Sequence, residues 1–269
     1  MTLARTSAAA IPGLSVWDLP DVPHVIQEHN PSSRAATDIN RSVALLPDDD
    51  VTEAHGCRVT VILRTILDCA RFEHPRDALV VADSGLRAIV RPRRRDSRDA
   101  VEERARPIRE TLLARIVDGS RGAAQARAVI RASNPYAESA PESVVRWIAI
   151  SRGMPTPILQ LPVQTARGTF YTDAAWRRLG TSPTRWQHVE FDGAIKYRKD
   201  PAGRLPADVV IAERRREAAI TGTGDWVIRI YPDEIDDEDR VFGKLTSKLN
   251  PRTVAAWQPD PDLFRLPGT

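Results

Sequence analysis

The sequence predicts an α/β protein in which a mostly helical N-terminal region precedes a domain built on a mixed β-sheet. Two observations predict this class. Helical apolar stripes dominate residues 61–132, whereas from residue 138 the order becomes helix, strand, strand, strand, helix, strand, helix. A chain of 269 residues is long enough for two domains. We therefore divide it into residues 1–90, a basic helical connector over 91–136, and a mixed-sheet domain over 137–269.

Residues 1–90 are expected to combine short strands and helices. Pro12 and Gly13 should end a short N-terminal helix, and a turn should follow Pro47. Ala78, Ala82 and Leu86 belong to one apolar helical stripe. The expected elements are helices over Thr2 to Ile11, Val61 to Phe72 and Pro75 to Ile89, and strands over Pro23 to Glu28 and Cys57 to Val61.

The connector is rich in arginine. One helix should carry an apolar face from Ile108 to Val117 and end at Gly119, and a second should cover Gly122 to Ala132. Residues 91–131 contain 12 arginines against 6 acidic residues. The guanidinium fork suits phosphate oxygens, so Arg93, Arg94 and Arg95 are candidate contacts to a DNA backbone. The alternative is a solvated helix face in an arginine-rich protein.

The third part begins with a helix that has a capping-box pattern, in which Ser139 is followed three residues later by Glu142. Gly168 should form a hairpin turn. The expected strands are Ile158 to Val163, Thr169 to Trp176, Trp186 to Phe191 and Trp226 to Tyr231, and the expected helices after the first are Ala207 to Ile220 and Asp236 to Leu249.

The composition excludes several classes of protein. The longest apolar stretch is interrupted by Arg64, so we expect no membrane helix. Cys57 and Cys69 are too few for a disulfide scaffold or a zinc module, and we expect two reduced thiols in a cytoplasmic protein. The five histidines show no spacing typical of a transition-metal site.

Three acidic residues gather around two expected strands. Asp173 lies on the second hairpin strand, and Glu190 and Asp192 share one face at the end of the next strand. Such carboxylates repel one another unless a cation binds, and Mg²⁺, or Mn²⁺ in its place, suits oxygen ligands. Lys196 could reach the same place and orient a water or neutralise a phosphate.

Each of these residues also has a structural interpretation. Asp192 and Gly193 form a common turn pair, and Glu190 could be an exposed strand residue. Glu142 could serve only as the capping partner of Ser139.

The third part resembles the C-terminal domain of bacterial proteins related to the very-short-patch-repair endonuclease, in the PD-(D/E)XK nuclease superfamily. The segments that carry the resemblance are residues 138–146 (ESAPESVVR), 153–160 (GMPTPILQ), 172–176 (TDAAW), 189–197 (VEFDGAIKY), 213–217 (ERRRE) and 225–230 (DWVIRI). The resemblance implies a restriction-endonuclease-like fold and Mg²⁺-dependent cleavage of double-stranded DNA.

The resemblance also implies roles for individual residues. Asp173 and Glu190 match the acidic residues of the two strands, and Glu142 matches the acid of the first helix. Asp192 stands where the superfamily usually has lysine, and Lys196 would substitute for it. Arg214 and Arg216 match a charged helix motif, in which Arg214 replaces a lysine, and both are candidate contacts to DNA.

The first part resembles type IV abortive-infection antitoxin proteins. The matching segments are residues 5–14 (RTSAAAIPGL), 23–25 (PHV), 59–60 (VT), 64–71 (RTILDCAR) and 78–83 (ALVVAD). Such proteins usually begin with a winged helix-turn-helix, and we expect that DNA-reading element to be absent. Arg64 and Asp68 have the spacing of a helical ion pair.

Three functions are consistent with these patterns. The first is a metal-dependent DNA endonuclease in defence or repair. The second is a DNA-binding regulator with an inactive nuclease fold. The third is an antitoxin-like module that binds a toxin or another protein. None of them involves a membrane.

Overall fold

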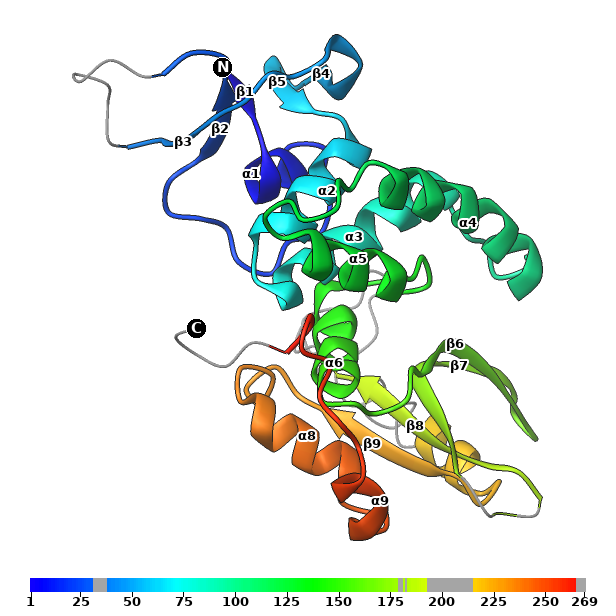
Figure 1. Cartoon of the computed structure of the whole chain (residues 1–269). Helices are drawn as coiled ribbons and strands as arrows, with labels where there is room; N and C mark the ends of the chain where they lie inside the picture. The colour runs from blue at the N-terminus through cyan, green and yellow to red at the C-terminus, as the bar shows by residue number, and fades with distance from the viewer. Residues whose placement is uncertain (31–37, 179–180, 182, 193–214, 265–269) are drawn as a thin grey trace. The chain divides into compact units, whose positions relative to one another are not determined.

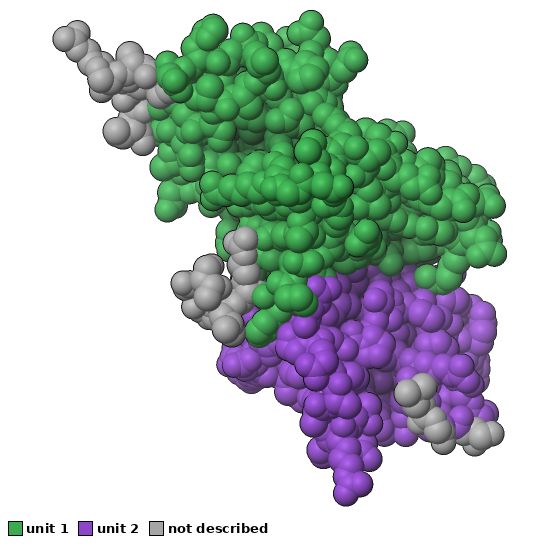
Figure 2. Space-filling model, in the orientation of Figure 1, with its two compact units in different colours: residues 1–144, 261–269 green, residues 145–260 purple. Residues whose placement is uncertain are grey.

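The computed structural model describes residues 1–30, 38–178, 181, 183–192 and 215–264 (Figure 1). The chain divides into two compact units, one formed by residues 1–144 and 261–269 and the other by residues 145–260 (Figure 2). The described residues confirm an α/β protein with a helix-rich N-terminal part and a sheet-containing C-terminal part. No described helix is both long and apolar enough to cross a membrane.

The first unit combines a five-stranded sheet of strand order β3-β2-β1-β5-β4 with a group of helices. Its strands are β1 (Thr2–Leu3), β2 (His24–Gln27), β3 (Asn40–Val43), β4 (Val51–Ala54) and β5 (Cys57–Thr60), with a 3-10 turn η1 (Asp48–Asp50). Its helices are α1 (Arg5–Ala10), α2 (Ile62–Phe72), α3 (Pro75–Val90), α4 (Arg98–Ala114) and α5 (Ala123–Ala132). The core is helical, because α2 packs on α1, α3 and α5, and α3 packs on α4.

The N-terminal segment corrects the expectation of a helix from Thr2. Thr2 and Leu3 pair with Ile26 and Val25 as an antiparallel strand, and the helix begins only at Arg5. A two-residue strand has no periodicity of its own, so only its partners reveal it.

The helix α4 also differs from expectation, because it begins ten residues earlier than Ile108 and ends at Ala114. Pro107 lies inside it. Val101 and Ala105 are fully buried and extend the apolar stripe of Leu112 toward the N-terminus. The predicted helix end was wrong, since Val117 lies outside the helix and is 72% exposed.

The second unit is built on a four-stranded sheet of order β6-β7-β8-β9. Helix α6 (Ala140–Ser151) crosses the boundary between the units. The strands are β6 (Ile158–Thr165), β7 (Gly168–Arg178), β8 (Arg185–Phe191) and β9 (Trp226–Ile230), and the later helices are α8 (Glu238–Thr246) and α9 (Pro251–Ala255). The strands β6, β7 and β8 pair antiparallel, whereas β8 and β9 pair parallel, so the predicted mixed sheet is confirmed.

The second helix of the predicted pattern, Ala207 to Ile220, lies partly outside the described residues, and residues 215–221 are helical. The parallel pairing of β8 with β9 requires a long connection, and residues 192–225 separate the two strands. The sequence did not predict α9, which begins at the N-cap Asn250 with Pro251 in its first turn.

Candidate functional site

Asp173 and Glu190 meet where the pairing of β7 and β8 ends. Ala174 pairs with Val189, so Asp173 and Glu190 are the next residues on the two strands. The Asp173 carboxylate accepts a hydrogen bond of 2.7 Å from the backbone amide of Phe191. A side-chain oxygen thus takes a place that a strand carbonyl would otherwise fill, and it fixes Asp173 beside the end of β8.

Strand β6, which pairs with β7, has an irregular backbone beside Asp173. Leu159 pairs with Ala174 and Leu161 pairs with Thr172, but Gln160 between them has a left-handed backbone with φ of +48°. Few residues other than glycine adopt this region, and such strain clusters at functional sites. The irregularity lies on the side of Asp173 that faces away from Glu190.

Glu190 and Asp192 are nearly buried, with exposed fractions of 7% and 6%. Both are held by the pairing of β8 with β9, because Glu190 lies opposite Arg229 and the Asp192 amide donates to the Ile230 carbonyl at 2.9 Å. The Arg229 guanidinium donates to the Asp192 carboxylate at 2.8 Å and to Glu217 at 3.1 Å. The sequence did not identify Arg229 as part of the site, although it lies in the matching segment 225–230.

Arg216 binds the Glu190 carboxylate. Its guanidinium donates to Glu190 at 2.9 Å and to the Tyr171 carbonyl at 2.5 Å. Its buried Nε atom has no hydrogen-bond partner among the residues that the structure describes. The sequence suggested Arg216 as a DNA contact, and in the structure its side chain is paired with Glu190 and is 22% exposed.

Arginines contact most of the acids at the strand ends. Arg216 contacts Glu190, and Arg229 contacts Asp192 and Glu217. In the described part of the chain, no three acidic, histidine or cysteine side chains converge as a metal-binding group.

A buried chain of polar side chains supports these strands. The Thr172 hydroxyl lies 3.0 Å from His188 Nδ1, and His188 Nε2 lies 3.3 Å from the Asp225 carboxylate. Burial lowers the pKa of His188 below its ordinary value, although Asp225 opposes this effect. Burial raises the pKa of Asp225, but hydrogen bonds from the Trp186 amide, Thr223 and His188 outweigh it and hold the pKa below the ordinary value.

This arrangement assigns the histidine tautomer. A carboxylate accepts only, so His188 Nε2 carries the proton and Nδ1 accepts from Thr172. Thr172 and His188 are adjacent in sequence to Asp173 and near Glu190, and both are fully buried. They act as a rigid support for the acidic strand ends. Sequence spacing gave no signal for this contact, because Asp225 comes from a third strand segment.

Glu142 belongs to the first unit and caps α6. Its carboxylate accepts from the Ser139 hydroxyl and from the Glu138 amide, both at 2.9 Å, and its own amide donates to Ser139 at 3.4 Å. The structural interpretation of Glu142 therefore accounts for its contacts. Lys196 and Arg214 lie outside the described residues.

Several arginines of the basic connector pair with acidic residues of the same unit, namely Arg104, Arg109, Arg115 and Arg127. Residues 93–95, all arginine, are exposed in the turn before α4. The turn is closed by the Arg93 amide, which donates to Asp96 at 3.1 Å. Three consecutive exposed arginines make this turn accessible to a phosphate backbone, although Arg98, Arg106 and Arg131 are exposed too.

Comparison with known proteins identifies relatives without assigned activity. The chain is 29% identical over 187 residues to an uncharacterized protein of Mycobacterium tuberculosis strain H37Rv and to an uncharacterized protein of strain CDC 1551. The match covers 69% of this chain and 58% of each relative, so the chain spans little more than half the length of these relatives. No protein-family profile matches the chain. No solved structure matches it.

Proposed function

We propose that the second unit is a Mg²⁺-dependent DNA endonuclease of the PD-(D/E)XK type. The observation that carries the proposal is the meeting of Asp173 and Glu190 at the paired ends of two strands of a mixed sheet. The resemblance to very-short-patch-repair endonucleases supports the same assignment, because its acids fall on these residues. The resemblance of the first part to antitoxin proteins supports a role in defence.

The residues at the strand ends fit a hard divalent cation in donor type. Asp173 and Glu190 offer carboxylate oxygens, which are the ligands that Mg²⁺ prefers. Mg²⁺ in enzymes that act on phosphates is commonly held by one or two carboxylates and several waters. Asp173 and Glu190 would hold it, and Mn²⁺ would fit the same donors.

When bound, the cation would activate a water and stabilise charge on the scissile phosphate. The chain's own residues have separate tasks. Asp173 is oriented by its bond to the Phe191 amide, and Glu190 is positioned by its strand neighbours. Arg216 pairs with one oxygen of Glu190 and would balance the charge of that carboxylate.

Arg229 supplies positive charge where the superfamily usually has a lysine. Asp192 stands at the lysine position, and the Arg229 guanidinium lies beside it at 2.8 Å. In this proposal Arg229 contributes the phosphate-facing charge that the sequence assigned to Lys196. A guanidinium never loses its proton near neutral pH, so Arg229 serves as a charge and not as a general base.

Plasmid nicking by the purified chain with Mg²⁺ or Mn²⁺ tests the proposal. We expect metal-dependent cleavage that falls at least a hundredfold in Asp173→Asn, because this change removes a ligand but keeps the side-chain shape. Asp236→Asn, an exposed acid of the same unit, is the matched control and should cleave at the wild-type rate. Absence of cleavage with every metal, from a folded protein, would contradict the proposal.

A second candidate function is a DNA-binding regulator with an inactive nuclease fold. The two arginine–carboxylate pairs favour it, because they neutralise Glu190 and Asp192 without a metal. Exposed Arg93 and Arg95 would then contact duplex DNA. Salt-dependent DNA binding together with no cleavage and no metal binding would support this function. Lack of DNA binding would instead support an antitoxin-like protein partner.

A further inference from the structure

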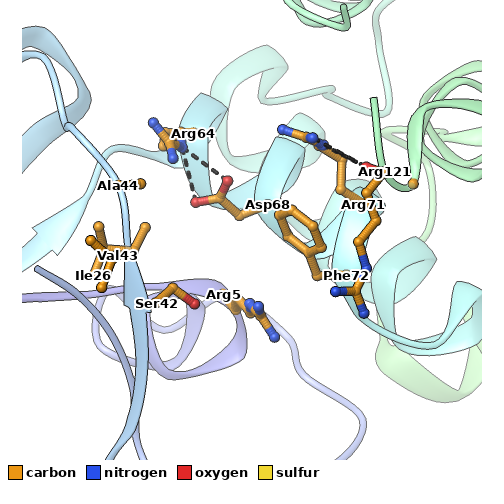
Figure 3. Close-up of a pocket in the computed structure, with 11 residues that line it drawn as sticks. Arg5, Ile26, Ser42, Val43, Ala44, Arg64, Asp68, Arg71, Phe72 and Arg121 are labelled. Atoms are coloured by element: carbon orange, nitrogen blue, oxygen red, sulfur yellow. Dashed lines mark hydrogen bonds and ion pairs between the residues drawn. The ribbon is translucent and has the colours of Figure 1, made fainter. Parts of the chain in front are cut away.

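The first unit contains a concave pocket of about 410 Å³ (Figure 3). This volume lies within the range of roughly 300–1,000 Å³ that is typical of small-molecule sites. Four arginines line it together with Asp68 and Phe72, and they come from α1, α2 and the segment before α5. The four are Arg5, Arg64, Arg71 and Arg121.

The acidic residues near the pocket do not neutralise the positive charge of its arginines. Arg64 Nε donates to both oxygens of Asp68 at 2.9 Å, and Arg64 Nη1 donates to Asp50 at 3.0 Å. Asp50 also pairs with Arg115. The lining residues and their ion-pair partners together contain five arginines and three acids, which leaves a surplus of two positive charges. The arginines are the four of the pocket and Arg115, and the acids are Asp68, Asp50 and Glu73.

Several guanidinium donors are unused. Within the described ranges, the side chain of Arg121 makes neither a hydrogen bond nor an ion pair, and Arg5 makes no hydrogen bond. The acid nearest to Arg5 is Glu73, at 3.8 Å. Arg71 uses Nε and Nη2 on the Arg121 carbonyl, at 3.2 and 3.1 Å, and leaves Nη1 unused. Each guanidinium has five N–H donors, so the pocket offers many bonds to an anion.

A strained backbone, an aromatic ring and a close backbone approach hold these arginines in place. Arg5 has a left-handed backbone with φ of +53°, a strained conformation for this residue. The guanidinium carbons of Arg5 and Arg71 lie 4.9 and 4.8 Å from the ring of Phe72, so the ring positions both. Gly122 passes so close to Arg71 that a Cβ there would lie 2.2 Å from the Arg71 carbonyl oxygen, which keeps Arg121 beside the pocket.

We propose that this pocket binds a phosphate monoester of nucleotide size. A dianionic phosphate matches the charge surplus of two, and its oxygens match the unused guanidinium forks. The recessed position of Arg64 and Asp68, whose side chains are 16% and 5% exposed, favours a group that enters the pocket over the convex backbone of a duplex. The proposal does not depend on the nuclease assignment, which concerns the other unit.

The test is calorimetric titration of the full chain without Mg²⁺ at constant ionic strength. The probes are inorganic phosphate, adenosine 5′-monophosphate and adenosine. We expect saturable binding of the two phosphates and none of adenosine. Arg121→Gln should weaken phosphate binding about tenfold, since one charge-assisted hydrogen bond contributes roughly 1.4 kcal/mol. Arg131→Gln, an exposed arginine on α5 outside the pocket, is the matched control and should bind as the wild type.

Two oligonucleotides identify the source of the phosphate. Stronger binding of a 5′-phosphorylated strand than of its 5′-hydroxyl counterpart would assign the site to a strand end, and binding of the free nucleotide alone would assign it to a small ligand. Equal binding of adenosine and its monophosphate, or wild-type affinity for the monophosphate in Arg121→Gln, would overturn the proposal. Arg71→Gln repeats the test if Arg121→Gln fails to fold by circular dichroism.

Discussion

The Asp192 carboxylate and the Arg229 guanidinium form an ion pair of 2.8 Å, although the residues lie 37 positions apart in the sequence. Their side chains are 6% and 16% exposed, so water screens the pair only weakly. The pair links the end of β8 to β9.

A double-mutant cycle measures this pair. Asp192→Asn and Arg229→Gln should each lower the free energy of unfolding by about 1–3 kcal/mol, because each leaves a poorly hydrated charge without its partner. The coupling energy should be about 1–3 kcal/mol in urea denaturation. The Arg229 change also removes the contact with Glu217, so Glu217→Gln serves as the control. Strictly additive losses would contradict a direct interaction.

Glu142 provides a test that separates capping from catalysis. Glu142→Gln keeps a residue that the capping box accepts, whereas Glu142→Ala removes the contacts to Ser139 and Glu138. We expect the alanine variant to lose about 0.5–2 kcal/mol of stability and the glutamine variant to lose less. Both should keep the wild-type nicking rate, measured below the melting temperature of each variant. Loss of cleavage in a stable Glu142→Gln protein would show a catalytic role.

His188 should make stability depend on pH. Its folded pKa lies below the ordinary value of 6.5, so below about pH 6.5 the unfolded chain takes up a proton that the folded chain excludes. Stability should therefore fall as the pH drops from 7.5 to 5.5, with a contribution of at most about 1.4 kcal/mol per pH unit. Urea denaturation of His188→Asn should show a flatter pH dependence than the wild type. Burial also lowers the pKa of His24 in the first unit, so His24 adds to the pH dependence of the wild type and of His188→Asn alike. An unchanged slope would contradict the assignment.

The exposed turn before α4 should contribute to DNA affinity through salt-dependent contacts. Replacing Arg93, Arg94 and Arg95 with alanine should reduce the slope of log affinity against log salt concentration by up to about 2.7, or 0.9 per lost phosphate contact. Fluorescence anisotropy with a labelled duplex measures this slope. Replacing Arg104, which is paired with Asp96, should change it less. An unchanged slope in the triple variant would remove the turn from the DNA surface.

The sequence predicted elements wherever local periodicity was strong. The helices α2, α3, α5 and α6, the strands of the second unit and the Ser139–Glu142 cap were all found close to their expected bounds. It predicted the four-residue strands β2 and β5, each of which buries two residues, but not β3 and β4, which bury none, nor the two-residue β1.

Local spacing also predicted the acidic residues of the candidate site but not their arginine partners. Alternation along one strand placed Glu190 and Asp192 on one face, and the expected pairing of the neighbouring strand placed Asp173 beside them. The ion pairs to Arg216 and Arg229 depend on contacts 26 and 37 residues apart, which no local spacing encodes. The predicted gathering of three carboxylates omitted these arginines, which neutralise two of the three acids.

Binding of Mn²⁺ to the metal-free chain, followed by electron paramagnetic resonance, tests the central claim most directly. That claim is that Asp173 and Glu190 hold a divalent cation. We predict one saturable site per chain in the wild type and in Asp236→Asn, weakened at least tenfold in Glu190→Gln. No saturable Mn²⁺ binding by folded wild-type protein, or equal binding by Glu190→Gln, would contradict the account.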